Sequence, residues 1–338
     1  MNEASSLEKR TLREGGLTVS PLGLGCMGMS SAYGPADRAA SVATIKSALD
    51  LGVNFFDTAD AYGGGHNEEL LGEALSGVRD QAVIATKFGI EVTTDGTRQI
   101  NGRPEYVRSC AEASLRRLGT DVIDIYYQHR VDKTVPIEET VGAMSELVAA
   151  GKVRYLGLSQ ASARSIERAC VVHPITALQT EWSIWTRELE GPVLDTARRL
   201  GLGIVAYCPL GRGFLAGGVT ARETLAPTDV RLKLPRFAGE NLPRNVETLS
   251  SLQDLAQRKG ITVAQLALAW VLSRGPDVVP IPGTKHSRYL AENVAATRVT
   301  LTSDELAFIE SLQPATSWAG QRSSAKLTQG FGDSPETA

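Results

Sequence analysis

The chain has 338 residues, 42% of them hydrophobic and 22% charged, and a formal net charge of −3. This composition fits one large α/β barrel, which typically takes about 250 residues plus insertions, and the weak negative charge offers no basic field for nucleic acid. The first ten residues contain acids and no apolar core segment, so we expect neither a secretory signal nor a membrane helix and place the protein in the cytoplasm.

The chain starts with a predicted hairpin. Residues 11–19 read TLREGGLTV, in which two consecutive glycines form the turn between short extended pieces. A short strand is expected over residues 22–25. A helix over residues 37–51 comes next, with Asp37 as its amino-terminal cap and Gly52 ending it.

Apolar strands and helical patterns then alternate along the chain. Runs of β-branched and aromatic residues mark buried strands, and apolar residues at helical spacing mark the segments between them. Strands that alternate with helices indicate a parallel sheet, and eight strand candidates are the number that a TIM barrel needs. The strand candidates begin at Leu22, Val53, Ala82, Val122, Val153, Ala177, Leu202 and Val278, and the later barrel helices are expected near residues 67–75, 104–118, 137–150, 162–172, 189–200 and 287–296.

The late part of the chain adds to this alternation. Residues 208–242 show no sustained helical or strand period, and stretches of that length tend to be functional lids or disordered segments. Residues 244–259 and 262–273 are expected to form two extra helices. The tail from Thr316 onward is polar and contains Gly and Ser, so we predict that it is mobile near its end.

An open doubly wound sheet is the alternative fold. GLGCMG at residues 23–28 has the GxGxxG spacing of a dinucleotide-binding turn. No helix opens directly after Gly28, where a pyrophosphate would need one, so we favour the barrel. We therefore interpret residues 1–338 as a single barrel domain whose core spans about residues 10–312.

The cysteines give no sign of a disulfide framework or a metal site. They are scattered without CxxC spacing or pairing with histidine. They are Cys26, Cys110, Cys170 and Cys208. We interpret Cys26 and Cys208, which lie near predicted strand ends, as small buried hydrophobic residues rather than as reactive thiols.

Three of the predicted strands end on ionisable residues. The apolar runs lead into Asp57, Lys87 and His129, and Tyr62 follows the first of them in a loop rich in glycine. Each of these residues alone is more often a cap, an ion-pair partner or a solvated loop residue. The carboxyl ends of parallel barrel strands meet at one mouth, where such enzymes place their chemistry, so the four together predict an active site.

These segments resemble a known family. FFDTADAY, VIATK and DIYYQHRVD are similar to the catalytic segments of the aldo-keto reductases, and GLGCMGMS is similar to the start of their bacterial and plant branch. The resemblance implies a (β/α)8 TIM barrel with an amino-terminal β-hairpin closing its bottom, a long loop after strand 7 and extra carboxyl-terminal helices. It also implies an NADPH-dependent oxidoreductase that reduces small aldehydes or ketones to alcohols, a reaction that requires no metal.

The resemblance also implies a role for each residue at the mouth. Hydride addition leaves charge on the carbonyl oxygen, so a proton donor must stand there. Tyr62 is expected to be that donor, with a pKa lowered from about 10 by the ammonium of Lys87, while Asp57 keeps Lys87 charged. His129 is expected to direct the carbonyl oxygen by a hydrogen bond.

Four further segments resemble those that bind the nicotinamide dinucleotide in this family, namely GLSQ, LQTEW, AYCPLGRG and IPGTKHSRYLAENV. The resemblance implies that Ser159 and Gln179 hydrogen-bond the carboxamide and that Tyr207 stacks on the nicotinamide. Lys285 and Thr284 are expected to bind the 2′-phosphate and so to favour NADPH over NADH. The full set is Ser159, Gln160, Gln179, Tyr207, Cys208, Pro209, Leu210, Gly211, Arg212, Gly283, Thr284, Lys285, Arg288, Glu292 and Asn293, with Leu210, Gly211 and Arg212 along the pyrophosphate and Glu292 and Asn293 at the adenine.

The substrate pocket is expected to be aromatic, which suits an apolar or aromatic carbonyl compound without identifying it. Its candidates are Tyr33, Phe88, Trp182 and Trp185. A second hypothesis is an NADPH-binding regulatory subunit of the potassium-channel β type, which shares the barrel and turns over little. No long amino-terminal segment before Thr11 points to a channel partner, so the enzyme is favoured.

Overall fold

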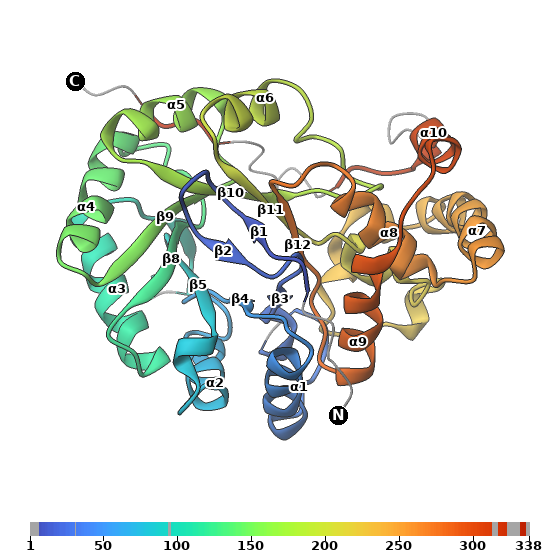
Figure 1. Ribbon diagram of the computed structural model, residues 1–338, viewed down its shortest axis with the longest axis horizontal. Helices are drawn as coiled ribbons and strands as arrows, with labels where there is room; N and C mark the ends of the chain where they lie inside the picture. The colour runs from blue at the N-terminus through green and yellow to red at the C-terminus, as the bar shows by residue number, and fades with distance from the viewer. Residues whose placement is uncertain (1–6, 31, 94–95, 313–316, 323–331, 336–338) are drawn as a thin grey trace.

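Eight parallel strands form a barrel with helices around it, as Figure 1 shows for the computed structural model. The structure describes residues 7–30, 32–93, 96–312, 317–322 and 332–335. The predicted (β/α)8 architecture is confirmed. In spatial order the strands are β3 (Leu24–Gly25), β4 (Phe55–Asp57), β5 (Val83–Phe88), β8 (Ile123–Gln128), β9 (Val153–Ser159), β10 (Ile175–Glu181), β11 (Gly203–Tyr207) and β12 (Val278–Ile281).

The first and last strands close the barrel at a seam made with glycine. Gly25 forms a parallel bridge with Gly283, and the amide of Gly23 donates to the carbonyl of Pro280 at 2.9 Å. A Cβ atom on Gly25 would stand 2.8 Å from the carbonyl oxygen of Ile281, closer than real Cβ atoms come. These glycines of the GLGCMG motif therefore serve a close backbone approach in the barrel wall rather than a dinucleotide-binding turn.

Helices alternate with the strands and cover the outside of the barrel. Asp37 caps the first of them by accepting a hydrogen bond from the amide of Ala40 at 2.7 Å. The ring consists of α1 (Arg38–Asp50), α2 (His66–Ala74), α3 (Pro104–Leu118), α4 (Ile137–Ala149), α5 (Ala163–Val172), α6 (Pro192–Arg199), α8 (Val263–Leu272) and α9 (Ser287–Ala295), while α7 (Asn241–Lys259) and α10 (Ser303–Ser311) lie at one side of it (Figure 1).

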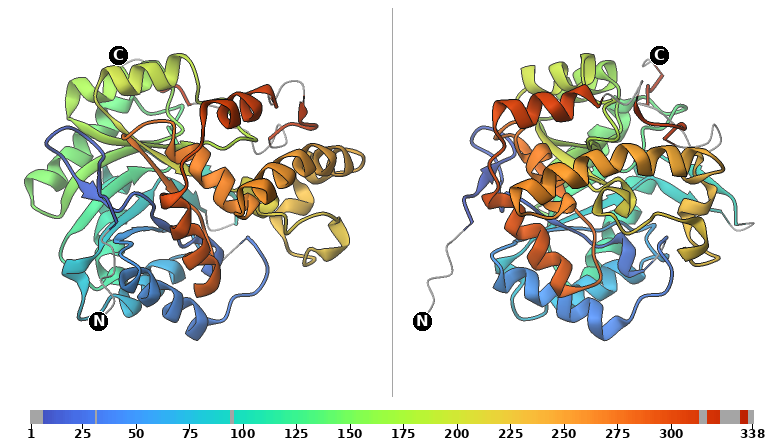
Figure 2. Two further views of the ribbon diagram at one scale, coloured as in Figure 1. Left: turned by 45° about the vertical axis from the view of Figure 1, so that its right-hand side comes forward. Right: turned by 90° about the vertical axis from the view of Figure 1, so that its right-hand side faces the viewer.

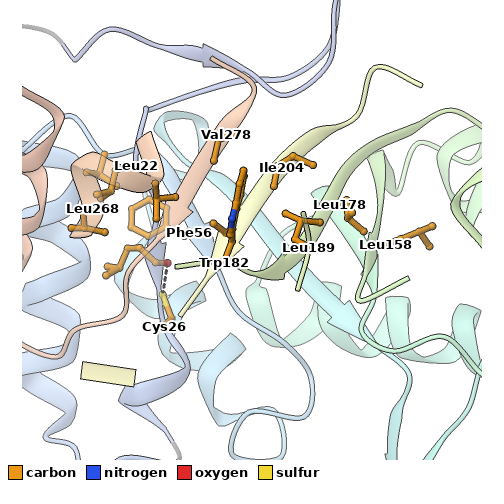
Figure 3. Close-up of a cluster of buried hydrophobic side chains, with 14 of the residues drawn as sticks. Leu22, Cys26, Phe56, Leu158, Leu178, Trp182, Leu189, Ile204, Leu268 and Val278 are labelled. Atoms are coloured by element: carbon orange, nitrogen blue, oxygen red, sulfur yellow. Dashed lines mark hydrogen bonds between the residues drawn. The ribbon is translucent and has the colours of Figure 1, made fainter. Parts of the chain in front are cut away.

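Strand residues alternate between two buried layers. One layer lies inside the barrel, where Phe55 and Ile125 pack with Leu12 of the hairpin formed by β1 (Arg10–Thr11) and β2 (Thr18–Val19). The hairpin fills the amino-terminal end of the barrel, since a Cβ on Gly203, the first residue of β11, would stand 2.2 Å from the Leu12 carbonyl oxygen. The other layer lies between the strands and the helices, and Figure 3 shows part of it.

Several elements differ from the sequence-based prediction. A hairpin of β6 (Ile90–Val92) and β7 (Arg98–Ile100) that was not predicted follows β5, and α10, for which no residue range was predicted, follows α9. The two strands are only three residues long and are at most partly buried, so they are too short for the alternation of apolar and polar residues that marks a half-buried strand. Helix α6 begins at Pro192 rather than at residue 189, because Gly191 has a φ of 98° and Pro192 favours the first helical position.

The long segment after β11 contains only short helical turns, in keeping with its lack of a sequence period. Figure 2 shows it, in yellow, beside α7. Its turns are η3 (Gly211–Ala216), η4 (Arg222–Thr224), η5 (Val230–Lys233) and η6 (Pro235–Phe237).

Described residues of the carboxyl-terminal tail contact the barrel. The amide of Gly332 donates to the carbonyl of Gln160 at 2.7 Å, and the amide of Ser162 donates to the carbonyl of Gly332 at 3.0 Å. The predicted mobility of the tail falls mainly on residues 323–331 and 336–338, which lie outside the described residues, and it stays a prediction.

The described part of the chain has neither a membrane-spanning helix nor a metal-binding cluster. No helix there is both long and apolar enough to cross a membrane, and no group of three or more His, Cys, Asp or Glu side chains there could hold a metal ion. The four cysteines all lie in this part and are free thiols, and Cys26 is fully buried.

Candidate active site

The ionisable strand ends lie together at the carboxyl-terminal mouth of the barrel. Lys87 is fully buried, and its ammonium donates to Asp57 Oδ1 at 2.6 Å, to the carbonyl of Thr58 at 2.7 Å and to the phenol oxygen of Tyr62 at 3.4 Å. The imidazole of His129 meets the ring of Tyr62 edge to face, with 5.7 Å between centroids. The structure thus brings together the four residues that the sequence singled out.

The two-residue period of a strand explains why these side chains share one mouth. Asp57, Lys87 and His129 each stand two residues after a side chain that packs inside the barrel, and so do two of the predicted cofactor residues, Gln179 and Tyr207. The pairs are Phe55 and Asp57, Ala85 and Lys87, Tyr127 and His129, Ala177 and Gln179, and Val205 and Tyr207.

A second hydrogen bond completes the partners of the buried carboxylate. Gln179 Nε2 donates to Asp57 Oδ2 at 2.6 Å, so both oxygens of Asp57 are occupied. Burying an ion pair is tolerated when the remaining lone pairs are satisfied in this way. Gln179, which was expected to face the cofactor carboxamide, therefore also holds the ion pair of Asp57 with Lys87 in place.

Burial dominates the titration of these groups. It lowers the pKa of Lys87 and raises the pKa of Asp57, and each partner's charge opposes the shift of the other. Burial also raises the pKa of Tyr62 well above its ordinary value, and the charge of Asp57 adds to this rise. The expected lowering of the Tyr62 pKa is not found, because burial and the charge of Asp57 outweigh the positive charge nearby. The phenol is therefore protonated, which is the state that a proton donor needs.

His129 is a neutral imidazole. Burial lowers its pKa well below the ordinary value, and the nearby charges of Arg130 and Lys87 lower it further. Its Nδ1 atom is buried and has no hydrogen-bond partner in the described part of the protein. Buried polar atoms without partners are uncommon in folded proteins, so this nitrogen is an unsatisfied group at the site.

The first group of predicted cofactor residues lies at the ends of β9 and β11. Gln160 Nε2 donates to the phenol oxygen of Tyr207 at 3.0 Å, while Gln160 Oε1 is buried and finds no partner among the residues described. The backbone of Gln160 is left-handed, with a φ of 54°. Ser159 Oγ accepts a hydrogen bond from Arg130 Nη1 at 3.3 Å. A carboxamide, which carries two N–H donors, fits the unpaired oxygen of Gln160.

The second group, from Cys208 to Arg212, makes a tight turn after β11. Cys208, Gly211 and Arg212 have left-handed backbones, with φ values of 49°, 55° and 59°. A Cβ on Gly211 would stand 2.7 Å from the ring of Trp185, so this position needs glycine. Arg212 donates to the phenol oxygen of Tyr33 at 3.3 Å. Pro209 and Leu210 complete this turn.

The third group starts at the barrel seam with Gly283 and Thr284. Lys285 is partly buried, and its ammonium donates to the carbonyls of Tyr33 at 3.0 Å and Pro35 at 2.8 Å. No side chain caps the amino end of α9, which follows directly. Lys285 therefore ties the loop after β3 to the start of a helix whose first amides are open to an anion.

The rest of this group lies on α9. Arg288 is exposed and stacks on the ring of Tyr289 at 4.5 Å. Glu292 accepts a hydrogen bond from Thr262 Oγ1 at 2.7 Å, and Asn293 is buried. Glu292 thus also has a structural partner at the start of α8.

Two of the predicted pocket aromatics pack in the outer core layer. Phe88 directly follows Lys87, so its side chain points to the opposite face of the strand. It is fully buried and packs against Tyr126 with 4.9 Å between ring centroids. Trp182 is buried beside Trp270, as Figure 3 shows for the surroundings of Trp182. We therefore do not include Phe88 and Trp182 in the proposed pocket. Trp185 is also buried, against aromatic side chains of η3, η6 and the tail.

Tyr33 joins the loop after β3 to the long segment after β11. Its ring lies 5.2 Å from the guanidinium of Arg231 in η5. Next to it, the amide of Val230 donates to the carbonyl of Ala32 at 3.0 Å. The two loops meet through these contacts, and Tyr33 remains a candidate neighbour of bound ligands.

Sequence reasoning missed a buried carboxylate and its arginine partners. Glu181 stands two residues after Gln179 and is almost fully buried, and Arg212 and Arg322 approach it at 3.4 and 3.6 Å. The phase of Glu181 along β10 was a usable signal. Arg322 comes from the tail, far away in the sequence, and no local pattern marks it. Arg130, which directly follows His129, was also not among the predicted site residues.

Fold and site together define a (β/α)8 protein with Asp, Tyr, Lys and His side chains gathered at the carboxyl-terminal mouth. The model of the Aldo/keto reductase family matches residues 21–314, and the chain belongs to this family. "Probable aldo-keto reductase 1" from Glycine max is 50% identical over 310 residues, which are 91% of this chain and 89% of that protein.

Solved structures agree with this assignment. The glycerol dehydrogenase AKR11B4 from Gluconobacter oxydans superimposes with a TM-score of 0.82 at 28% identity, covering 92% of this chain and 95% of its own. An aldo/keto reductase from Klebsiella pneumoniae, solved in complex with NADP and acetate, has a TM-score of 0.72 at 29% identity and covers 91% of this chain and 96% of its own.

Proposed function

We propose that the protein is an NADPH-dependent oxidoreductase that reduces aldehydes or ketones to alcohols. The observation that carries the proposal is the hydrogen-bonded series from Asp57 through Lys87 to Tyr62, beside a neutral His129. Membership of the family and the relatives solved with NADP or NADPH support the choice of cofactor.

Tyr62 is the proton donor in this proposal. Bound NADPH supplies a hydride to the carbonyl carbon, and the carbonyl oxygen then needs a proton. Burial keeps the phenol of Tyr62 protonated, and the ammonium of Lys87 stabilises the negative charge that develops on the phenol oxygen when the proton leaves. Asp57 keeps Lys87 charged in a buried site that would otherwise favour the neutral amine.

His129 orients the carbonyl oxygen. A neutral imidazole has one N–H donor, and its unpartnered Nδ1 shows that the ring is not fully used by the protein. The rings of His129 and Tyr62 are neighbours, and in this proposal the imidazole N–H and the phenol O–H both serve one carbonyl oxygen.

The predicted cofactor residues have the chemistry that the dinucleotide needs. Ser159 and Gln179 would hydrogen-bond the carboxamide, with Gln160 beside them, and Tyr207 would stack on the nicotinamide. Leu210, Gly211 and Arg212 would follow the pyrophosphate, with Thr284, Lys285 and Arg288 at the 2′-phosphate and Glu292 and Asn293 at the adenine. The unpaired Gln160 Oε1 and the uncapped amino end of α9 support this placement.

Steady consumption of NADPH with a panel of carbonyl compounds tests the proposal, with absorbance as the readout and NADH in parallel. Turnover of several simple aldehydes or ketones is the expected result. Binding of NADPH without turnover of any compound would contradict it and would instead fit a cofactor-binding regulatory subunit.

Tyr62→Phe is the first prediction. The variant lacks the proton but keeps the ring, so turnover should fall by about two or more orders of magnitude while NADPH binding survives. Steady-state kinetics and a fluorescence titration with NADPH measure the two effects. Turnover within a few-fold of the parent would remove Tyr62 from the role of donor.

A further inference from the structure

Arg130 presents a charge to the mouth that no role above uses. It directly follows His129 and leaves β8 at the end that carries the site. Its Nη1 atom donates to the carbonyl of His129 at 2.6 Å and to Ser159 Oγ at 3.3 Å. The guanidinium is therefore held between the ends of β8 and β9, and it is partly buried.

The guanidinium forms no ion pair with any carboxylate in the described part of the chain. There, its hydrogen bonds come from Nη1 alone, so Nε and Nη2 of Arg130 are unoccupied. These two groups lie on one edge of the guanidinium and form the fork that binds a carboxylate by two parallel hydrogen bonds. The buried carboxylates nearby already have partners, since Lys87 occupies Asp57 and Arg212 occupies Glu181.

The charge of Arg130 acts on the reacting groups. Burial raises the pKa of Tyr62 and of Tyr207, and the Arg130 charge opposes both rises. It also adds to the lowering of the His129 pKa by burial. Because Asp57 compensates Lys87 and His129 is neutral, Arg130 is an uncompensated cation at the place where the carbonyl is reduced.

We propose that Arg130 binds a carboxylate of the substrate, so that the protein prefers carbonyl compounds that carry an acid group, such as oxo acids and semialdehydes. This inference rests on the proposed reductase function and adds the substrate class. It replaces the expected apolar aromatic substrate, whose lining residues Phe88 and Trp182 pack in the core.

The carboxylate itself does not react in this proposal. The carbonyl carbon gains the hydride of NADPH, the carbonyl oxygen gains the proton of Tyr62, and the products are a hydroxy acid and NADP⁺. The fork of Arg130 only holds the acid group and so fixes which carbonyl faces Tyr62 and His129.

Matched pairs of substrates test the inference. We would compare kcat/KM for 4-carboxybenzaldehyde with its methyl ester, and for 4-oxobutanoate with its methyl ester. The parent should favour the acid by about tenfold or more in at least one pair, as expected for a charge-assisted pair of hydrogen bonds. Arg130→Met should bring that ratio to about one or below, and Arg130→Lys, which keeps a charge without the fork, should lie between them.

Arg322→Met is the matched control, because Arg322 also lies near the mouth but is paired with Glu181 and Glu188. Its acid-to-ester ratio should equal that of the parent. Equal rates for acids and esters in the parent, or an unchanged ratio in Arg130→Met, would overturn the inference. Arg130→Met could instead lose NADPH affinity and keep the acid-to-ester ratio of the parent. Arg130 would then act only through Ser159, and the inference would be overturned.

An equilibrium measurement separates this inference from the proposed function. Benzoate and benzamide are titrated against the protein saturated with NADP⁺, with tryptophan fluorescence as the readout. Benzoate binding that exceeds benzamide binding and is lost in Arg130→Met supports the inference even if no compound is turned over. Equal binding of the two probes overturns it even in an active reductase. Circular dichroism confirms that each variant is folded.

Discussion

Lys285 already has two partners in the protein, and this affects how it can meet a phosphate. An ammonium has three N–H donors. In Lys285, two of them donate to the carbonyls of Tyr33 and Pro35. A 2′-phosphate would take the remaining donor or replace one of these weaker acceptors, because a charge-assisted hydrogen bond is stronger than one to a neutral carbonyl.

Lys285→Ala should therefore weaken NADPH by about 1 to 3 kcal/mol and leave NADH nearly unchanged. Fluorescence titrations give the two dissociation constants. Lys9→Ala is the control, since Lys9 is exposed beside the hairpin at the opposite end of the barrel. Equal losses for both cofactors, or a parent that prefers NADH, would contradict the role of Lys285.

Asp60 makes stability depend on pH. It lies between Asp57 and Tyr62, and its amide donates to the carbonyl of Lys87 at 3.1 Å. Burial raises its pKa to about 7, and the charge of Glu68 adds to the rise. An acid whose pKa is higher in the folded than in the unfolded state favours folding at low pH, and this contribution is lost as the pH rises from about 4 to about 7.

Asp60→Asn should remove this dependence. The free energy of unfolding of the variant, relative to the parent, should rise between about pH 4 and pH 7 and then stay level. Urea unfolding at several pH values across this range measures it. Asp254→Asn is the control, because Asp254 is an exposed residue of α7. Its free energy of unfolding relative to the parent should not rise between about pH 4 and pH 7 in this way. A constant offset for Asp60→Asn would contradict the prediction.

Most single residues of the site could be found from the sequence by the phase of the strands. Asp57, Lys87 and His129 end apolar runs, and the barrel places such ends at one mouth. The same phase would have excluded Phe88, which directly follows Lys87 and so points to the opposite face of the strand. Partners of hydrogen bonds, such as Gln179 for Asp57, depend on neighbouring strands and leave no local pattern.

Within the strands, Gly157 is required by the barrel interior. A Cβ there would stand 2.3 Å from the ring of Tyr127, which is fully buried on the neighbouring β8. Gly157→Ala should therefore lower stability by about 1 to 3 kcal/mol through overpacking. Gly142→Ala is the control, because Gly142 lies in α4 with no atom within 4 Å of an added Cβ.

Alanine at position 142 should raise stability by up to about 1 kcal/mol, since alanine favours a helix more than glycine does. Thermal and urea unfolding of both variants measure the two effects. A neutral Gly157→Ala would show that the ring of Tyr127 moves aside freely.

The segment from 208 to 242 is the element whose behaviour should change with the cofactor. Its contact with the loop after β3, through Val230 and Ala32, lies beside the predicted phosphate residues. We expect NADPH to protect its backbone amides from hydrogen exchange, while α3 exchanges as before. Unchanged exchange over residues 208–242 at saturating NADPH would argue against a lid.

Elements whose apolar residues recur at helical or strand spacing were predicted well, and elements without such spacing were not. α3 and α4 carry an apolar stripe and clear boundaries, and both lie where the sequence placed them. The hairpin of β6 and β7 pairs within itself, has strands of only three residues and has no fully buried strand residue, so its sequence carries no pattern long enough to predict it. The short turns η3 to η6 depend on contacts made in space.

For the whole molecule, alternation and strand number determine the barrel, whereas its long-range contacts cannot be read from the sequence. Arg322 near Glu181 and Gly332 beside Gln160 join the tail to the ends of β10 and β9. No local signal predicts which segment a distant tail will meet. The composition of the tail indicated a polar segment that is mobile near its end and gave no contact partner.

The glycine seam between β3 and β12 also bears on synthesis in the cell. About three quarters of the chain separates Gly25 from Gly283, and translation at about 5 to 20 residues per second needs on the order of tens of seconds to cover it. Throughout this time the nascent β3 has one open edge, a row of backbone groups ready to pair with other chains. The yield of native protein should therefore depend on how well ribosome-associated chaperones shield this first strand until the last one emerges.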